Sequence, residues 1–420
     1  MILPDSFIQR IKDIPDFDRF IKSFDCKPYK GQRFNPLKIN PQIKALPWCK
    51  TGQLIDSTLS KTLDYHAGLF YLQEPSAMSP VEALKPKKGE FVLDLCAAPG
   101  GKSTQIAGHL LGEGLLIAND SSASRCKALV KNIETAGIKN AIILTETPYK
   151  LSLHFKEFFD AILVDAPCSG EGMFRRDNDT IKAYNENKPM ACTKLQNEIL
   201  FYAAKMLKPG GRLVYSTCTF NRIENEDVIK NFLYNHKDFY IKKINLNGLV
   251  EGFDNIGSRI WPHMATGEGH FIALLYKNGK TSENTKIKTN NPPKCFEEFI
   301  QLDLKNGSYN TIGETLYFKP YDINLNGLRV AKSGLELGDI KNHGFIPSYH
   351  LAMSLKEYNF CINLSEADAW RYMRGESLEF NKKGKAWVLV CYNNYPLGWA
   401  RLVQGRLKNH LPKGRVVKYM

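Results

Sequence analysis

The sequence lacks three features, each of which is typical of a particular class of protein. Its 420 residues contain no Cys-X-X-Cys pair, no internal repeat and no run of about 18 apolar residues, the length that a membrane-spanning helix needs. The ten cysteines are scattered singly from Cys26 to Cys391, which argues against a zinc ribbon and a disulfide scaffold. The first ten residues hold Asp5 and no apolar core, so we expect no secretory signal. We therefore expect a cytoplasmic protein with free thiols, no metal and no membrane contact.

Positive charge is present in excess. The chain has 57 Lys and Arg against 43 Asp and Glu, a net charge of +14. A mild basic excess is common in soluble proteins. It is also typical of proteins that bind a polyanion, because contacts of Lys and Arg with phosphates release counterions and so favour binding. Six of the charges follow Ala400 without any acid among them: Arg401, Arg406, Lys408, Lys413, Arg415 and Lys418.

The length predicts two or three domains, because a single core rarely exceeds ~250–300 residues. One segment, TSENTKIKTNNPPK, has Ile287 as its single apolar residue and reads as a linker. We place a small N-terminal α/β module at residues 1–80, a central domain at 81–279, the linker at 280–294 and a C-terminal domain at 295–420.

Strand and helix patterns alternate through the central domain. Short apolar runs predict buried strands at 90–96, 114–120, 141–146, 158–167, 211–219 and 269–277. Apolar stripes at helical spacing predict helices at 103–112, 124–137 and 194–211. This alternation predicts a parallel, doubly wound sheet, whose ligands bind beyond the carboxyl ends of the strands.

The flanking regions give fewer signals. The segments FIQRI and FDRFIKSF predict helices near the N-terminus, and RFNPLKI at 33–39 predicts a strand. Near the C-terminus, residues 383–401 predict two strands joined by a turn at Asn393-Asn394.

A loop of small residues, Cys96-Ala97-Ala98-Pro99-Gly100-Gly101-Lys102-Ser103, joins the first predicted strand to its helix. Small residues let a ligand approach the backbone, and the helix N-terminus favours an anion. An ATP-binding (Walker A) loop would need glycine where Cys96 stands. ILVD at 162–165 could nevertheless be the Walker B strand that accompanies such a loop, so this alternative stays open. The G-x-G-x-x-G of a dinucleotide site is absent. S-adenosylmethionine fits best, with its carboxylate at the loop and its ribose on Asp120, 19 residues after Gly101.

Two cysteines follow two strands that should be neighbours. Cys168 lies in DAPCSG after the strand that ends at Asp165, and Cys218 lies in STCT at the end of the next strand. We expect both thiols to face one cleft. A thiolate that adds to carbon 6 of cytosine makes carbon 5 nucleophilic enough to accept a methyl group, and nearby positive charge is needed to favour that thiolate. Methylation of an amino group would need no thiol, so the cysteines point to carbon.

At this point the sequence resembles a known family. The segments at 94–107, 159–175 and 207–229 are similar to the signature motifs of the Nop/Sun family of RNA cytosine-5 methyltransferases. The segments at 71–78 and 396–414 are similar to the RsmF-like subfamily, which acts on small-subunit ribosomal RNA and carries a PUA-like tail. The resemblance implies a Rossmann-like methyltransferase core with an N-terminal RNA-binding module and a C-terminal PUA-like domain.

The resemblance also implies roles for individual residues. Cys218 matches the nucleophile and Cys168 the cysteine that helps release the product, while Lys102 and Asp165 lie at the target base. DNA cytosine methyltransferases use the opposite cysteine for attack. The implied cofactor residues are Cys96, Ala97, Ala98, Pro99, Gly100, Gly101, Lys102, Asp120, Arg125 and Asp165. Relatives often carry an acid near the adenine after the third strand, and Glu146 is the nearest acid there.

We therefore expect an S-adenosylmethionine-dependent enzyme that methylates carbon 5 of an unstacked cytidine, in small-subunit rRNA or the assembling subunit. We expect a monomer. A transfer RNA substrate, a DNA substrate and a non-catalytic assembly factor remain as alternatives.

Overall fold

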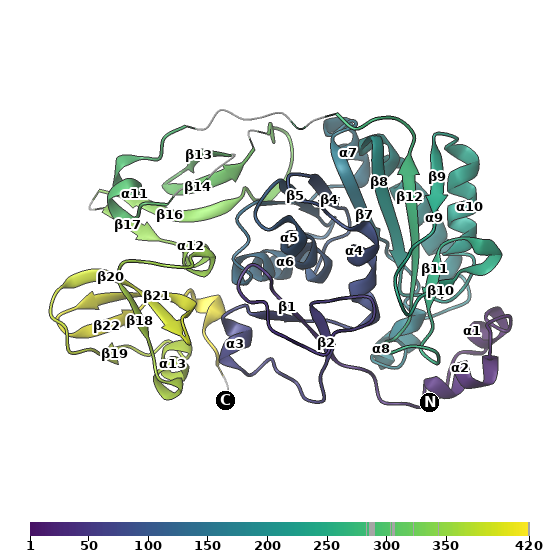
Figure 1. The fold of residues 1–420 in the computed structure, drawn as a ribbon, viewed down its shortest axis with the longest axis horizontal. Helices are drawn as coiled ribbons and strands as arrows, with labels where there is room; N and C mark the ends of the chain where they lie inside the picture. Colours follow the sequence, from purple (N-terminus) through teal and green to yellow (C-terminus); the bar gives the residue numbers. More distant parts are fainter. Residues whose placement is uncertain are drawn as a thin grey trace.

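The computed structural model describes residues 1–282, 284, 290–302, 304, 307–321, 323–342 and 344–418. Six residues of the predicted linker, 283 and 285–289, lie outside the described residues. Figure 1 shows a large central sheet with helices on both faces, and two smaller sheets formed by C-terminal residues beside it. Within the described part, no helix is long and apolar enough to cross a membrane.

Five parallel strands form the centre of a ten-stranded sheet. Their order is β8-β7-β4-β5-β6, with bounds Leu207–Thr217, Phe159–Asp165, Phe91–Asp94, Leu115–Asn119 and Ala141–Leu144. Every residue of β4, β5 and β6 is buried, as expected for parallel strands that are covered on both faces. The predicted core strands and the parallel centre of the sheet are confirmed.

Helices cover each face of this sheet (Figure 1). The core on one face contains α4 (Ser79–Leu84), α5 (Gly101–Leu110) and α6 (Ala123–Thr135). The core on the other face contains α7 (Pro148–His154), α9 (Lys188–Met206) and α10 (Glu226–Asn235). The predicted helix at 194–211 ends earlier, at Met206, and the chain enters β8 directly.

The sheet is mixed, because antiparallel strands extend one side of the parallel centre. Strand β12 (His270–Lys277) runs antiparallel to β8, and β11 (Ser258–Ile260) and β10 (Val250–Glu251) follow it. Strand β9 (Phe239–Lys242) also pairs with β12. Periodicity predicted the strand at 269–277 but carries no information on direction, so the expectation of a wholly parallel sheet was wrong at this edge.

A strand from far along the chain completes the opposite side of the sheet. Strand β15 (Val330–Lys332) pairs antiparallel with β6. The Lys332 side chain is only 3% exposed, and its ammonium lies 2.8 Å from Glu134 on α6 and 3.2 Å from Glu336. Part of the predicted C-terminal domain is thus built into the sheet of the predicted central domain.

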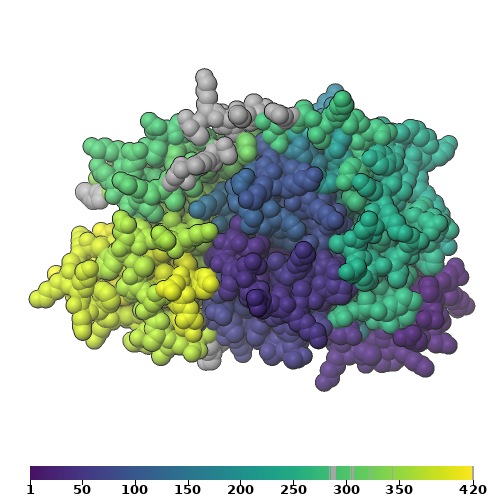
Figure 2. Space-filling model, in the orientation of Figure 1, coloured from purple at the N-terminus to yellow at the C-terminus, as the bar shows by residue number. Residues whose placement is uncertain are grey.

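The N-terminal residues form a three-stranded sheet, β2-β1-β3, and short helices. The bounds are α1 Asp5–Arg10, α2 Phe17–Ser23, β1 Gly31–Phe34, β2 Gly52–Leu54, α3 Leu63–His66 and β3 Phe70–Leu72. The predicted strand at 33–39 ends at Phe34, because the Asn35 side chain accepts a hydrogen bond from the Leu37 amide and Pro36 cannot donate one. Figure 2 shows most of this segment, purple to blue, between the yellow C-terminal residues and the teal residues of the central part.

The C-terminal residues form two further sheets. The first has the order β13-β14-β16-β17, with bounds Gly307–Ile312, Thr315–Pro320, Leu335–Lys341 and Gly344–Pro347. The second has the order β18-β20-β21-β22-β19, with bounds Cys361–Asn363, Lys385–Tyr392, Tyr395–Val403, Arg406–Asn409 and Leu378–Glu379. Three helices accompany them: α11 Lys294–Phe299, α12 Tyr349–Ser354 and α13 Glu366–Met373.

The predicted hairpin near the C-terminus is confirmed as β20 and β21. Asn393 and Asn394 connect the strands with φ of 48° and 65°, the positive values that a type I′ turn requires. Trp399 on β21 is buried and donates to the Ser348 carbonyl, so it packs the C-terminal core and presents no surface for a base.

Replacing Lys332 with Ala should destabilise the protein by roughly 1–3 kcal/mol, because Glu336 and Glu134 lose the buried ammonium that both of them bind, while Glu134 keeps Arg415. Urea unfolding of the full chain measures the change. Lys341→Ala is the control, since the Lys341–Glu314 pair is exposed and should contribute ~0–1 kcal/mol. Equal losses from the two variants would contradict this account of how β15 is held.

Candidate active site

The two predicted cysteines lie side by side at the carboxyl ends of β7 and β8. These strands pair in parallel with Asp165 opposite Ser216, so the loops that follow them leave the sheet together. The sulfur atoms of Cys168 and Cys218 are 3.4 Å apart, and both residues are partly exposed. The structure thus brings the two predicted cysteines together.

The close contact makes the two thiols chemically unequal. The hydrogen bond with Cys218 is the largest cause that raises the pKa of Cys168 well above its ordinary value, followed by burial and by the charge of Cys218. Cys168 therefore keeps its proton.

A partly buried ion pair lies next to the thiols. The Lys102 ammonium is 2.7 Å from Asp165 Oδ2, and Ser216 Oγ donates to Asp165 Oδ1 at 2.8 Å. Burial alone would lower the pKa of Lys102, but Asp165 and, to a smaller extent, Cys218 raise it above its ordinary value. Burial would likewise raise the pKa of Asp165, but Lys102 and His270 bring it well below the usual range. Both groups therefore stay charged.

His270 belongs to this cluster, and no sequence pattern predicted it. It is the first residue of β12 and is buried, with Nε2 3.5 Å from Asp165 Oδ1. The antiparallel pairing of β12 with β8 brings it to the cysteine end of the sheet. The strand pattern at 269–277 was visible in the sequence, but the pairing that places His270 was not.

Side chains from the end of β5 and from α6 hold the loop of small residues in place. Gly100, with φ of 113°, caps α5, and a Cβ there would lie 3.0 Å from Leu129. The Ala98 amide donates to Asp120 Oδ2 at 3.3 Å, and Asn132 Nδ2 donates to the Pro99 carbonyl at 2.8 Å. The loop is thus preformed, and Asp120 stands buried at the end of β5 as predicted.

Arg125 supports the loop from the side. Its guanidinium donates to the Ala98 carbonyl at 2.7 Å and lies 3.4 Å from Asp120. These contacts make Arg125 a positioning residue for the predicted cofactor loop. Its side chain is 56% exposed.

Asp94, at the end of β4, faces the same loop from the core. Its side chain is fully buried, Ser103 Oγ donates to its Oδ2 at 2.6 Å, and its Oδ1 has no partner among the described residues. Burial raises the pKa of Asp94 to about 7. Burial also raises the pKa of the neighbouring Cys96 well above the ordinary value, so this thiol stays protonated.

Glu146, the acid nearest to the expected adenine position, is already occupied. Its Oε1 accepts from the Arg329 amide at 2.7 Å and from Lys150 at 3.0 Å, and its Oε2 lies 3.2 Å from the Arg329 guanidinium. The carboxylate is 1% exposed. Glu146 anchors the segment before β15. Both of its carboxylate oxygens have partners there, so neither is free to bind a ligand.

Buried acids tie the two cysteine loops together. Glu171, after Cys168, accepts from the Phe220 and Asn221 amides at 2.8 and 3.0 Å. The hydroxyls of Ser169 and Thr219 are 2.7 Å apart. Glu171 is fully buried and braces the two loops against each other.

Fold and site together define a class. The core is that of a Rossmann-like methyltransferase: it has a parallel sheet, a glycine-rich loop before α5 and an acid after β5. The paired thiols resemble those of the enzymes that methylate cytosine at carbon 5.

Comparison with known families agrees with this class and narrows it. Residues 81–276 match the family described as 16S rRNA methyltransferase RsmB/F. The residues on either side match the N-terminal domain of 16S rRNA methyltransferase RsmF at 3–75, its first C-terminal domain at 295–355 and its PUA domain at 359–417.

Individual relatives match almost the whole chain. The ribosomal RNA small subunit methyltransferase F of Shewanella loihica is 33% identical over 465 residues, covering 99% of this chain and 95% of that protein. Its counterpart from Shewanella sp. (strain W3-18-1) is 31% identical over 464 residues, covering 98% and 95%. A methyltransferase homolog protein from Pyrococcus horikoshii, whose crystal structure is known, is 31% identical with a TM-score of 0.55, covering 65% of this chain and 93% of that one. The chain belongs to the RsmF family of 16S rRNA methyltransferases.

The raised pKa of Asp94 predicts a pH-dependent cost of folding. Between its ordinary value of 3.8 and about 7, the folded protein binds more protons than the unfolded chain, so this carboxyl makes stability fall as the pH rises. The stability of Asp94→Asn relative to the wild type should therefore increase from about pH 4 to about pH 8, by about 1.4 kcal/mol for each unit between the two pKa values. Urea unfolding across this range measures it, and a constant difference between the two proteins would contradict it.

Proposed function

We propose that this protein transfers a methyl group from S-adenosylmethionine to carbon 5 of a cytidine in small-subunit ribosomal RNA. The observation that carries the proposal is the 3.4 Å contact between Cys168 and Cys218 beside the Lys102–Asp165 pair. Membership of the RsmF family supports the substrate class. The enzyme acts as a monomer in the cytoplasm, without a metal.

The residues around the loop fit S-adenosylmethionine. The unpartnered Oδ1 of buried Asp94 is an acceptor that the ammonium of the amino acid part would satisfy. Ala97, Ala98 and Gly100 put no large side chain between a ligand and the backbone, and the carboxylate of Asp120 would accept from ribose hydroxyls. The bound cofactor supplies an electrophilic methyl group on a sulfonium centre. Lys102 is the second residue of α5, so the same helix carries the end of the loop and the ammonium that lies near Cys218.

Cys218 attacks first. Its thiolate forms a bond to carbon 6 of the cytosine, and the displaced electron pair makes carbon 5 the nucleophile that takes the methyl group. The positive charge of the Lys102 ammonium favours a thiolate nearby. The two groups are close enough that Cys218 raises the pKa of Lys102. Asp165, Ser216 and His270 fix the position of Lys102.

Cys168 completes the reaction. Once Cys218 is a thioether it carries no charge, so two causes that raise the pKa of Cys168, the hydrogen bond and the charge of Cys218, weaken. Cys168 then loses its proton more easily and its thiolate removes the carbon-5 proton. The electron pair of the broken C–H bond re-forms the carbon 5–carbon 6 double bond and expels the Cys218 thiolate.

A pair of variants tests these roles. Cys218→Ala should lower the methylation rate by at least about 10³-fold, because the nucleophile is lost. Cys168→Ala should accumulate a covalent RNA adduct through Cys218, visible as a slowly migrating band in denaturing gels with S-adenosylmethionine and ribosomal RNA.

The control for both is Cys361→Ala, an exposed cysteine on β18 that should leave methylation and gel mobility unchanged. Methylation at the wild-type rate by Cys218→Ala would refute its role, and the absence of an adduct with Cys168→Ala would refute the release role. Bisulfite sequencing of ribosomal RNA from a deletion strain identifies the cytidine.

The cofactor assignment has its own test. Calorimetry should detect binding of S-adenosylmethionine, with an affinity at least about tenfold lower in Asp120→Ala, because the ribose loses charge-assisted hydrogen bonds. Binding of ATP without binding of S-adenosylmethionine would instead favour the nucleotide-loop alternative.

A further inference from the structure

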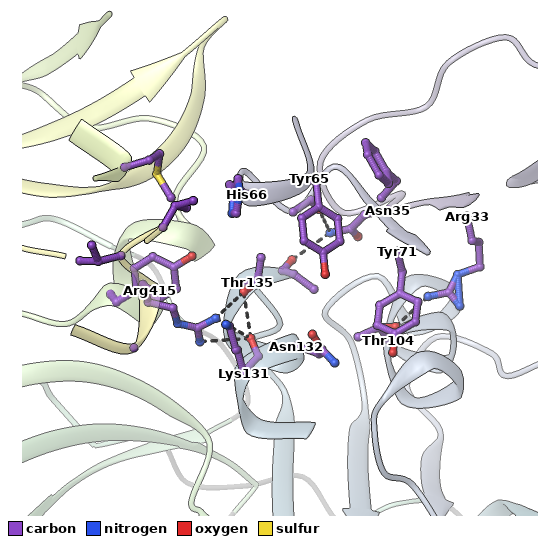
Figure 3. A pocket seen from close by; sticks show the side chains of 18 residues that line it. Arg33, Asn35, Tyr65, His66, Tyr71, Thr104, Lys131, Asn132, Thr135 and Arg415 are labelled. Carbon is purple, nitrogen blue, oxygen red and sulfur yellow. Dashed lines mark hydrogen bonds between the residues drawn. The ribbon is translucent and has the colours of Figure 1, made fainter. Parts of the chain in front are cut away.

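A cavity of about 280 Å³ lies where the N-terminal sheet, the methyltransferase helices and the C-terminal segment meet. Figure 3 shows Tyr65, Tyr71 and Arg33 from the N-terminal part, Thr104 and Lys131 from α5 and α6, and Arg415 from the far end of the chain. None of its lining residues belongs to the cysteine cluster. The cavity is thus a separate feature of the fold.

The lining is cationic. It includes Arg33, Lys131 and Arg415, and no Asp or Glu is among the lining residues. Arg415 is anchored by Glu134 at 2.5 Å and by Thr135 at 2.7 Å, whereas the Lys131 ammonium has no hydrogen bond or ion pair among the described residues. Burial and the charge of Arg415 lower the pKa of Lys131. An anionic group beside Lys131 would relieve this repulsion.

The lining is also aromatic. The rings of Tyr65 and Tyr71 border the cavity, and the Arg33 guanidinium lies 5.7 Å from the Tyr71 ring centre. Neither tyrosine hydroxyl is hydrogen-bonded within the part of the chain that the structure describes. Flat rings with free hydroxyls beside an unpaired ammonium match a nucleotide, which combines a stacking base with a phosphate.

The cavity adjoins the loop of small residues and the start of α5. Thr104, which lines it, is the fourth residue of α5. Asn132, which also lines it, donates to the Pro99 carbonyl of the loop. Arg33 donates to the Gly101 carbonyl at 2.8 Å and to Thr104 Oγ1 at 2.7 Å, which fixes the N-terminal wall against the start of α5.

From this arrangement we infer that the cavity binds one unpaired nucleotide of the substrate RNA close to the target cytidine, with its base against Tyr65 and Tyr71 and its phosphate at Lys131. The inference rests on the proposed function in taking RNA as the substrate. It adds a second contact for a single strand, which would hold the target loop open while the cytidine enters the cysteine cleft.

The test measures binding of a small-subunit rRNA transcript to the full-length protein at several salt concentrations. Lys131→Ala should bind several-fold more weakly and lower the slope of log affinity against log salt by about 1, the loss of one phosphate contact. Tyr65→Ala should weaken binding about tenfold, and Tyr65→Phe, which keeps the ring, should restore most of the affinity. Both weakened variants should raise the KM for RNA while kcat at saturating RNA stays near the wild-type value.

Lys127→Ala is the matched control, because Lys127 lies exposed on the same helix and does not line the cavity. Calorimetry with S-adenosylmethionine checks that each variant is folded. Wild-type affinity and salt slope in both Lys131→Ala and Tyr65→Ala would overturn the inference. Binding of free cytidine monophosphate that depends on Lys131, with unchanged RNA affinity, would also overturn it in favour of a free nucleotide. If the wild type binds RNA through Lys131 but transfers no methyl group to it, the proposed function fails and the nucleotide site stands.

Discussion

The parallel pairing of β7 with β8 is the constraint on which the site depends. With Asp165 opposite Ser216, the two loops that follow the strands begin at the same level of the sheet, and their cysteines meet after similar lengths of chain. A shift of the register by one residue would exchange the faces of every side chain on one strand and separate Asp165 from Ser216. The buried core on both faces of the sheet opposes such a shift, so the catalytic geometry is secured by apolar packing far from the thiols.

Polar groups within the protein then set the finer positions. Asp165 alone connects the start of α5, the end of β8 and the start of β12, through Lys102, Ser216 and His270. Glu171 does the same for the loops that carry the cysteines. Carboxylates removed from water are costly unless their oxygens are satisfied, and here groups from different elements satisfy the oxygens of Asp165 and Glu171. The arrangement is therefore rigid before any ligand enters.

Much of this could be predicted from local sequence. The central strands, α5, α6, the glycine-rich loop and the neighbouring ends of the two cysteine strands all follow from apolar periodicity and from small residues between a strand and a helix. What the sequence could not supply depends on contacts between distant residues. His270 reaches Asp165 only because β12 reverses direction, and Glu146 is taken by Arg329, 183 residues further along the chain. Arg33, read only as part of a strand, proves to be buried against α5.

The pairing of β15 with β6 has a consequence for how the protein is made. Strand β6 ends at Leu144, yet its partner is not synthesised until residues 330–332 have left the ribosome. For all that time β6 is an open sheet edge with apolar side chains and unpaired backbone groups, the type of edge that associates with other strands. The C-terminal part thus protects the methyltransferase sheet as well as extending it, and a nascent chain that ends before residue 330 exposes this edge. N-terminal regions fold first during synthesis, so β15 is the last strand to join this sheet, and its pairing covers the open edge of β6.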